Sequence, residues 1–216
     1  MRFRSLLLLS LVTIMSAAQA AEPLDPKRGS EIGTVVEAFL TPHQEPGEEK
    51  DTPSLAPKEF RSTAPSLLRA ERPARGHGRI SFTKDLSRAY VEVAFENVVA
   101  ADVVMFHIHC GRPDQLGPII VDFGHFEDLR AKLSGGAFKF EVTNEVIEAT
   151  TEAGHGLVGT LTAGCPVVPD NPLWGKVKTV AGMEYIARKG ELYFNLHTKG
   201  QIFYGDIRGQ LIPVAR

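Results

Sequence analysis

Hydrophobic and polar residues alternate along much of the chain with the two-residue period of half-buried β-strands. The clearest case spans residues 79–95, where two alternating runs flank a turn at Lys84-Asp85. One helix is predicted over residues 180–189, ending at Gly190. Further strands are predicted over residues 32–40, 103–109, 119–123, 138–142, 191–198 and 204–212. Eight short strands with little helix predict an all-β sandwich or barrel with long loops.

The first twenty residues depart from this pattern. Arg2 and Arg4 precede an apolar run over residues 6–15, and residues 18–20 (AQA) match an A-x-A cleavage site. These features predict a secretory signal peptide over residues 1–20. The apolar run is shorter than the roughly 20 residues that a membrane span requires, and no later stretch is long and apolar enough. We therefore expect a periplasmic or secreted protein without a membrane span in the mature chain.

The rest of the chain is predicted to be one domain with a long insertion. Residues 21–30 are polar and are expected to form a leader before a single domain over residues 31–216. Between residues 41 and 76 the periodicity disappears, and this stretch contains six prolines and dense charge. A structureless stretch of this length is usually functional or mobile. Within it, residues 64–70 are the one candidate for a short helix.

Composition and charge narrow the range of partners. The 216 residues are 43% hydrophobic and 23% charged, which is typical of a globular protein. The formal charge of −2 becomes −4 without residues 1–20, because these contain two arginines and no acidic residue. Dedicated nucleic-acid-binding proteins usually carry a marked basic excess, so no nucleic-acid partner is expected. No feature of the sequence identifies a protein partner.

Two cysteines, Cys110 and Cys165, remain to be explained. An oxidising compartment favours a disulfide between them. Closing a loop of this length stabilises the fold by about 4 kcal/mol in the chain-entropy model. The alternative is that Cys110, which directly follows two histidines, is a soft metal ligand.

The candidate chemistry lies on two of the predicted strands. His107 and His109 are two positions apart in the strand 103–109, so both point to one face while their apolar neighbours point to the core. His197 points outward in the strand 191–198 for the same reason. Three neutral imidazoles suit copper or zinc. We predict a single metal site on the outer face of the sheet, with copper preferred and zinc possible.

The other histidines are weaker candidates. His125 follows the strand 119–123 closely and is the best candidate for a fourth ligand. His43, His77 and His155 are expected in solvated loops.

The last predicted strand carries Asp206, Arg208 and Gln210 on one face. Its simplest interpretation is a solvated face with an ion pair between Asp206 and Arg208, and the alternative is that one of them orients a ligand or a small anion. The sequence contains no G-x-S-x-G nucleophile elbow, no P-loop and no G-x-G-x-x-G fingerprint.

Four blocks together resemble the CHRD (chordin-type) domain family. The family shows A-H-I-H-G, G-P-V-V-V, Y-V-N-V-H-T and G-E-I-R-G-Q-L in this order, and the chain has FHIHCG at 106–111, GPIIVD at 117–122, LYFNLHT at 192–198 and GDIRGQL at 205–211. The resemblance covers about residues 31–213 and is sharp only in these blocks. At the N-terminal side the family's G-A-Q-E-V-P-P is only echoed by residues 41–46, and the charged insertion is a departure.

The resemblance implies a Greek-key, immunoglobulin-like sandwich akin to that of copper/zinc superoxide dismutase. In that fold an H-x-H strand and a histidine of a later strand bind copper, and His107, His109 and His197 match these positions. The dismutase zinc loop, with its bridging histidine and further ligands, has no match. The resemblance therefore implies at most a copper-only or otherwise mononuclear site, and it does not imply dismutase activity.

Three functions follow as hypotheses. The first is an exported protein that binds one metal ion, preferably copper, through His107, His109 and His197. The second is a copper-only enzyme of superoxide dismutase type, with Arg208 as the electrostatic guide for the anion. The third is a metal-free structural or interaction module in which the histidines only form hydrogen bonds.

Overall fold

The structure is a computed structural model that describes residues 23–154, 159, 161–167 and 175–214. The signal peptide predicted over residues 1–20 and His155 lie outside the described residues. Eight strands run through the described part of the chain: β1 (Ile32–Leu40), β2 (Arg75–Thr83), β3 (Ala89–Glu96), β4 (Val103–Cys110), β5 (Ile119–Asp122), β6 (Ala137–Val142), β7 (Leu192–Thr198) and β8 (Ile207–Pro213).

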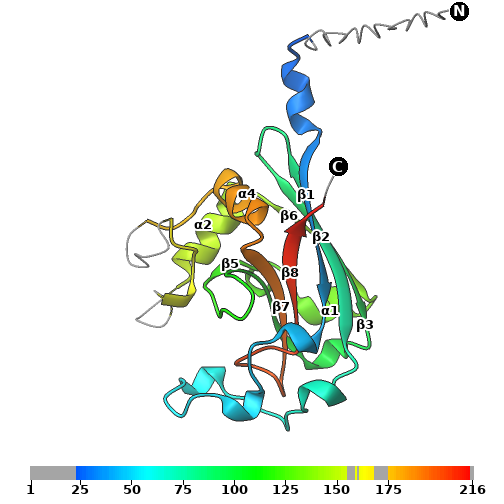
Figure 1. The fold of residues 1–216 in the computed structure, drawn as a ribbon, viewed down its shortest axis with the longest axis vertical. Helices are drawn as coiled ribbons and strands as arrows, with labels where there is room; N and C mark the ends of the chain where they lie inside the picture. Colours follow the sequence, from blue (N-terminus) through cyan, green and yellow to red (C-terminus); the bar gives the residue numbers. More distant parts are fainter. Residues whose placement is uncertain (1–22, 155–158, 160, 168–174, 215–216) are drawn as a thin grey trace, which may run out of the picture.

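The eight strands form one antiparallel sheet in the order β5-β4-β7-β8-β1-β2-β3-β6. Figure 1 shows that this sheet is strongly curled, as a half-barrel. Within the sheet, β8 pairs with β7 along five residues but with β1 at only two. The all-β class predicted from the alternating pattern is confirmed.

The concave side of the sheet holds the apolar core. The ring centroid of Phe106 in β4 lies 4.8 to 5.8 Å from those of Phe95, Phe123, Phe138 and Phe194. Phe95 belongs to β3, Phe138 to β6 and Phe194 to β7, and Phe123 directly follows β5. Strands that are distant in the sheet therefore meet across the core. Aromatic rings at such separations add to the stabilisation from buried area.

Helices account for little of the part of the chain that the structure describes. The predicted helix is confirmed as α4 (Val180–Arg188), which is capped by the Thr179 hydroxyl and is followed by Gly190 at φ +68°. The sequence prediction missed α1 (Leu129–Leu133) and α2 (Asn144–Glu152). α1 is too short to show a helical period, and α2 buries only two of its nine residues. No helix in the described part of the chain is long and apolar enough to cross a membrane.

The N-terminal leader and part of the predicted insertion differ from expectation. The leader contains a 3-10 helix, η1 (Pro26–Ser30), capped by the side chain of Asp25. The helix predicted over residues 64–70 is wrong, because the structure has only a 3-10 turn, η5 (Arg69–Glu71), at its end. The leucines of that stretch are about half exposed, so no apolar stripe is buried to stabilise a helix. Near the expected end of the insertion, strand β2 begins at Arg75.

Residues 41–72, which we refer to as the cover, lie at one end of the sheet beside the loop between β7 and β8 (Figure 1). Side-chain hydrogen bonds fasten the two together. The Glu49 carboxylate accepts from the backbone N–H of Phe203 at 3.0 Å, and Gln201 Nε2 donates to the Leu67 carbonyl at 2.8 Å. The cover also contains the 3-10 turns η2 (Pro42–Gln44), η3 (Glu49–Asp51) and η4 (Lys58–Phe60).

Candidate metal centre

The pairing of β4 with β7 brings the three predicted histidines together. Its register sets His107 opposite Asn195 and His109 opposite Tyr193, and His197 follows Asn195 by two residues on the same face. The ring centroid of His107 lies 5.2 Å from that of His109 and 5.4 Å from that of His197. One ring nitrogen from each histidine lies within 4.8 Å of the other two. The structure therefore confirms the meeting of residues from two separate strands.

These histidines are buried, and this corrects the expectation of an open outer face. They do lie on the face of the sheet that points away from the core. However, only 3% of His107, 8% of His109 and 5% of His197 is exposed. The loop between β7 and β8 folds back against this face, and the cover fastens that loop. A strand pattern shows which face a residue takes, but it does not show what is packed against that face.

Backbone carbonyls orient two of the rings. His109 Nδ1 donates to the Gly117 carbonyl at 2.8 Å, and His197 Nδ1 donates to the Ile202 carbonyl at 2.8 Å. Because a carbonyl only accepts, each of these rings carries its proton on Nδ1. Nε2 of each ring is then left with a free lone pair. Metal-binding histidines commonly have the other ring nitrogen held in this way.

The third ring is oriented by a carboxylate and uses the opposite nitrogen. His107 Nε2 lies 3.4 Å from Asp122 Oδ1, which leaves Nδ1 as the ring nitrogen without this contact. Nδ1 of His107 and Nε2 of His109 and His197 are all buried and have no hydrogen-bond partner among the described residues. Buried polar atoms without partners are rare and each requires an explanation. Three histidines with such free ring nitrogens could hold a metal ion.

The surroundings of His109 and His197 lower the pKa of both imidazoles. Burial, with His107 as a second cause, holds the pKa of His109 well below its ordinary value. Burial likewise lowers the pKa of His197 to about 3. A metal binds the neutral ring, so neither residue has to lose a proton at neutral pH before it can coordinate an ion.

Tyr193 links the histidines to Arg208. Its ring stacks on that of His109, with centroids 4.9 Å apart and planes 4° apart, and the guanidinium carbon of Arg208 lies 3.5 Å from the Tyr193 ring centroid. The tyrosine oxygen accepts a hydrogen bond from the Gly117 N–H at 2.9 Å. The peptide groups around Gly117 thus hold both His109 and the ring packed on it.

The interpretation of the last strand as a solvated face is wrong. Arg208 is 1% exposed, and its guanidinium donates to the carbonyls of Gln115 and Arg112, each at 2.9 Å. Asp206 Oδ1 lies 3.8 Å from Nη1 of Arg72, a residue of the cover, and the expected Asp206–Arg208 pair is replaced by these contacts. The alternating pattern identified the face correctly, but the cover and the loop before β5 bury it.

A buried acid lies beside this network. Glu45 of the cover is 2% exposed, and burial raises its pKa to about 8 although Arg208 and Arg72 act in the opposite direction. Neither its carboxylate oxygens nor Asn195 Oδ1 have a hydrogen-bond partner in the described part of the chain. Both groups crowd Gly205, where a Cβ would lie 2.0 Å from Asn195 Oδ1 and 2.9 Å from Glu45 Oε1, and where φ is +94°. Glycine is therefore required at position 205. The sequence analysis did not identify Glu45 as a buried residue.

Cys110 and Cys165 form a disulfide, which confirms the predicted pair and removes Cys110 as a thiolate ligand. The disulfide follows His109 directly and lies at the end of β4. The Cys110 N–H also donates to the Pro118 carbonyl at 3.0 Å. The bond therefore holds the chain next to Gly117, the residue that orients His109.

The remaining histidines lie apart from this group. His125 ends the 3-10 turn η7 (Phe123–His125), its ring lies 4.9 Å from that of Phe126, and it does not belong to the group of meeting ligand atoms found among the described residues. His77 lies in β2 instead of a loop, where it is exposed and hydrogen-bonded to Glu37. His43 is exposed in η2 of the cover.

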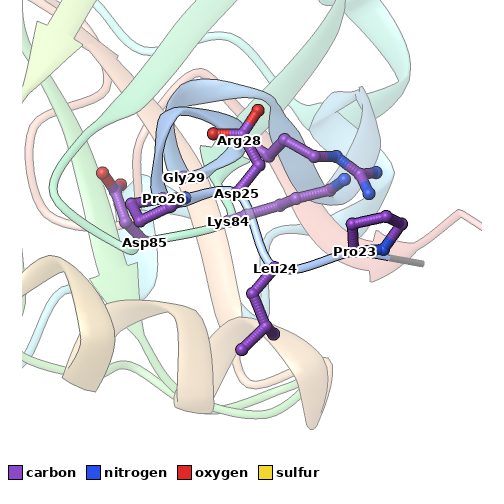
Figure 2. Close-up of a pocket in the computed structure, with 8 residues that line it drawn as sticks. All are labelled: Pro23, Leu24, Asp25, Pro26, Arg28, Gly29, Lys84 and Asp85. Carbon is purple, nitrogen blue, oxygen red and sulfur yellow. The ribbon is translucent and has the colours of Figure 1, made fainter. Parts of the chain in front are cut away.

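A surface hollow has none of the three clustered histidines in its lining. Figure 2 shows it between the N-terminal 3-10 helix and the turn that joins β2 to β3, at the end of the sheet opposite the cover. It is lined by Pro23, Leu24, Asp25, Pro26, Arg28, Gly29, Lys84 and Asp85. Its charges belong to both signs, so it does not select a ligand by charge.

The comparison with known families agrees with the resemblance seen in the four blocks. The family model described as the CHRD domain matches residues 62–211, and the chain belongs to this family. The match contains all three clustered histidines and leaves out residues 41–61 of the cover. No curated protein and no solved structure matches the chain.

Proposed function

We propose that this CHRD-domain protein is an exported metal-binding protein that holds one copper ion with His107, His109 and His197. One observation carries the proposal. Three buried imidazoles each offer a ring nitrogen within 4.8 Å of the other two, and each ring has one buried nitrogen without a hydrogen-bond partner among the described residues. A metal-free module would leave three lone pairs facing one another, which is unfavourable in a buried place.

Copper is favoured over zinc by the chemistry of the donors. Imidazole suits both metals, and for a given set of nitrogen ligands copper is bound more tightly than zinc in the general order of divalent affinities. A zinc-loaded protein remains the expected state where copper is scarce. His125 is not needed as a ligand in this proposal.

Export is supported by two features. Residues 1–20 have the charge and apolar pattern of a signal peptide. The disulfide between Cys110 and Cys165 is of the kind that persists in oxidising compartments. We propose that the mature protein works in the periplasm or outside the cell.

The proposal concerns binding and not superoxide dismutation. An anion-guiding cation has to reach solvent, yet Arg208 is 1% exposed and is engaged by Tyr193 and two carbonyls. The residue expected to steer the anion is therefore occupied in structural contacts.

Metal titration tests the proposal. Purified protein is titrated with Cu(I) and Cu(II) against chromophoric chelators and with Zn(II) by calorimetry. We expect one ion per chain, with tight binding lost in the double variant His107→Ala/His197→Ala. The matched control is His77→Ala, an exposed histidine outside the group, which is expected to bind as the wild type does.

Two outcomes contradict the proposal. One is a wild-type affinity that the double variant retains. The other is an absence of stoichiometric metal both after titration and in elemental analysis of protein purified from its own compartment, with the fold intact. His125→Ala is included as a further arm, and a loss of affinity in this variant would add His125 to the ligands.

A further inference from the structure

A methionine lies next to the histidines in the sheet. The register of β4 with β7 sets Met105 directly opposite His197. Met105 also precedes His107 by two residues, so both point to the same face of β4. Residues directly opposite in an antiparallel pair have Cβ atoms about 4.5 to 5.5 Å apart. Met105 thus neighbours one ligand across the sheet and another along the strand.

The opposite face is already taken by core residues. Phe106, which follows Met105, is fully buried among the phenylalanines of the core, and Val103 is 1% exposed in the same core. A register irregularity between Val103 and Met105 accounts for their differing faces despite the two-residue spacing. Met105 is half-buried on the histidine face, which lies opposite the apolar core.

We propose that the thioether of Met105 is a further ligand of the site and makes it selective for Cu(I). This inference rests on the proposed metal site and concerns which ion it prefers. Thioether sulfur is a soft ligand that favours Cu(I), whereas it adds little affinity for Zn(II). The side chain has three rotatable bonds, so from a neighbouring position it can direct its sulfur toward the ring nitrogens.

The charge balance of the site favours a monovalent ion independently. The three imidazoles and a thioether are all neutral, so they do not compensate the charge of an ion held among side chains that are at most 8% exposed. The carboxylate of Asp122 lies 3.4 Å from Nε2 of His107, whereas Nδ1 is the nitrogen of that ring without a partner. Arg208, a cation, acts on His109 electrostatically. A buried single charge is less unfavourable than a buried double charge under these conditions.

The experiment compares Cu(I) and Zn(II) affinities of the full mature protein and of Met105→Leu. Leucine keeps the volume and apolar character, so the variant is expected to fold. We expect its Cu(I) affinity to fall by about ten- to a hundredfold with little change for Zn(II). X-ray absorption of the Cu(I)-loaded wild type should show a sulfur neighbour that is missing in the variant.

The matched control is Met183→Leu. Met183 is the other methionine of the described chain, and it is fully buried in α4 against the core. Its variant should keep both affinities and the sulfur signal. Equal Cu(I) affinity in wild type and Met105→Leu, together with a wild-type spectrum without sulfur, would overturn the inference while leaving the histidine site standing. Absence of binding of either ion by the wild type would instead overturn the proposed function itself.

Discussion

Around Phe106 and His107 both faces of β4 and β7 are closed to water, but their chemistry is opposite. On one face Phe106 and Phe194 are fully buried in a core of aromatic and aliphatic side chains. On the other face His107 and Asn195, their neighbours in sequence, are 3% and 2% exposed. Burial therefore affects stability differently on the two faces of these strands. The apolar face is stabilised by area and packing, while the polar face has to satisfy each buried nitrogen and oxygen.

The polar face meets this demand only in part. Arg208 and one nitrogen of His109 and His197 are well partnered, whereas the opposite ring nitrogens, Glu45 and Asn195 keep polar atoms without partners in the described chain. Such atoms are expensive where the fold is the only purpose of a surface. Their concentration on one face, and not in the core, is what indicates a functional region.

The two faces also differ in how they are assembled. The core face is covered by other strands and by helices α1, α2 and α4, whereas the polar face is closed by the cover and by the loops after β4 and β7. The family match begins at residue 62, so Glu45 and Glu49 of the cover come from outside it. The matched residues 62–211 thus contain the three histidines but neither of these two carboxylates.

The largest expected difference between the faces comes from Phe106 and His107, which are adjacent in the chain. Phe106→Ala removes the central ring of the aromatic core and is expected to lower the free energy of unfolding by about 3 to 5 kcal/mol. His107→Ala removes a ring with an unpartnered nitrogen and should lower it by about 1 kcal/mol or less in metal-free protein. Urea denaturation of both variants measures these values.

For copper binding, the same two variants should show the reverse order of effects. Phe106→Ala, where folded, should still bind copper, while His107→Ala should not. Equal losses of stability in the two variants would mean that the histidine face contributes to folding as the core does, and that the contrast between the faces is wrong.

Sequence pattern was sufficient for the strands because strand alternation is a local property. The alternation of apolar and polar residues in β4 depends only on the residues of that strand. It correctly assigned Phe106 to the core face and His107 to the opposite face. The pair Cys110–Cys165 and the helix ending at Gly190 could be predicted for similarly simple reasons. Local rules failed for α2, which buries only two residues and so shows little helical period.

The site was predicted only in outline because burial on its face depends on distant segments. Arg208 alternates as a solvated residue would, yet carbonyls of the loop before β5 and the ring of Tyr193 enclose it. Glu45 lies in a stretch without periodicity, so nothing local marks it as buried. The one available signal was the concentration of charge and proline in a long insertion, which indicated function without naming a residue.

A second prediction concerns Glu45 and pH. Its pKa is raised from 4.5 to about 8 by burial, so the folded state holds the proton more tightly than the unfolded state. The resulting stabilisation is fully present below about pH 4.5 and is lost as pH rises toward 8. Glu45→Gln mimics the protonated acid and does not titrate. Between about pH 5 and pH 8 the wild type should lose about 1 to 3 kcal/mol of unfolding free energy relative to this variant.

The buried histidines change the pH dependence of the unfolding free energy in the opposite direction to Glu45. The pKa values of His109 and His197 are lowered by burial, so their stabilisation is present above about pH 6.5 and is lost as pH falls below it. Both proteins contain these residues, and the difference between wild type and Glu45→Gln isolates the carboxyl. A difference that stays constant from about pH 5 to pH 8 would show that Glu45 is ionised in the folded protein and that the polar face is wetter than the structure indicates.

The smallest expected effect tests whether the polar face orients its ligands or merely encloses them. Asp122 Oδ1 lies 3.4 Å from His107 Nε2, and Asp122 also accepts from the Gly124 N–H as the cap of η7. Asp122→Asn keeps an accepting oxygen for both contacts but removes the charge that makes the imidazole a better donor to metal. Copper affinity should fall by about tenfold with the unfolding free energy nearly unchanged. Asp25→Asn is the matched control, since Asp25 caps η1 in the same way at the far end of the sheet. If both variants bind copper as the wild type does, the carboxylate has no part in orienting His107, and the ring is held by packing alone.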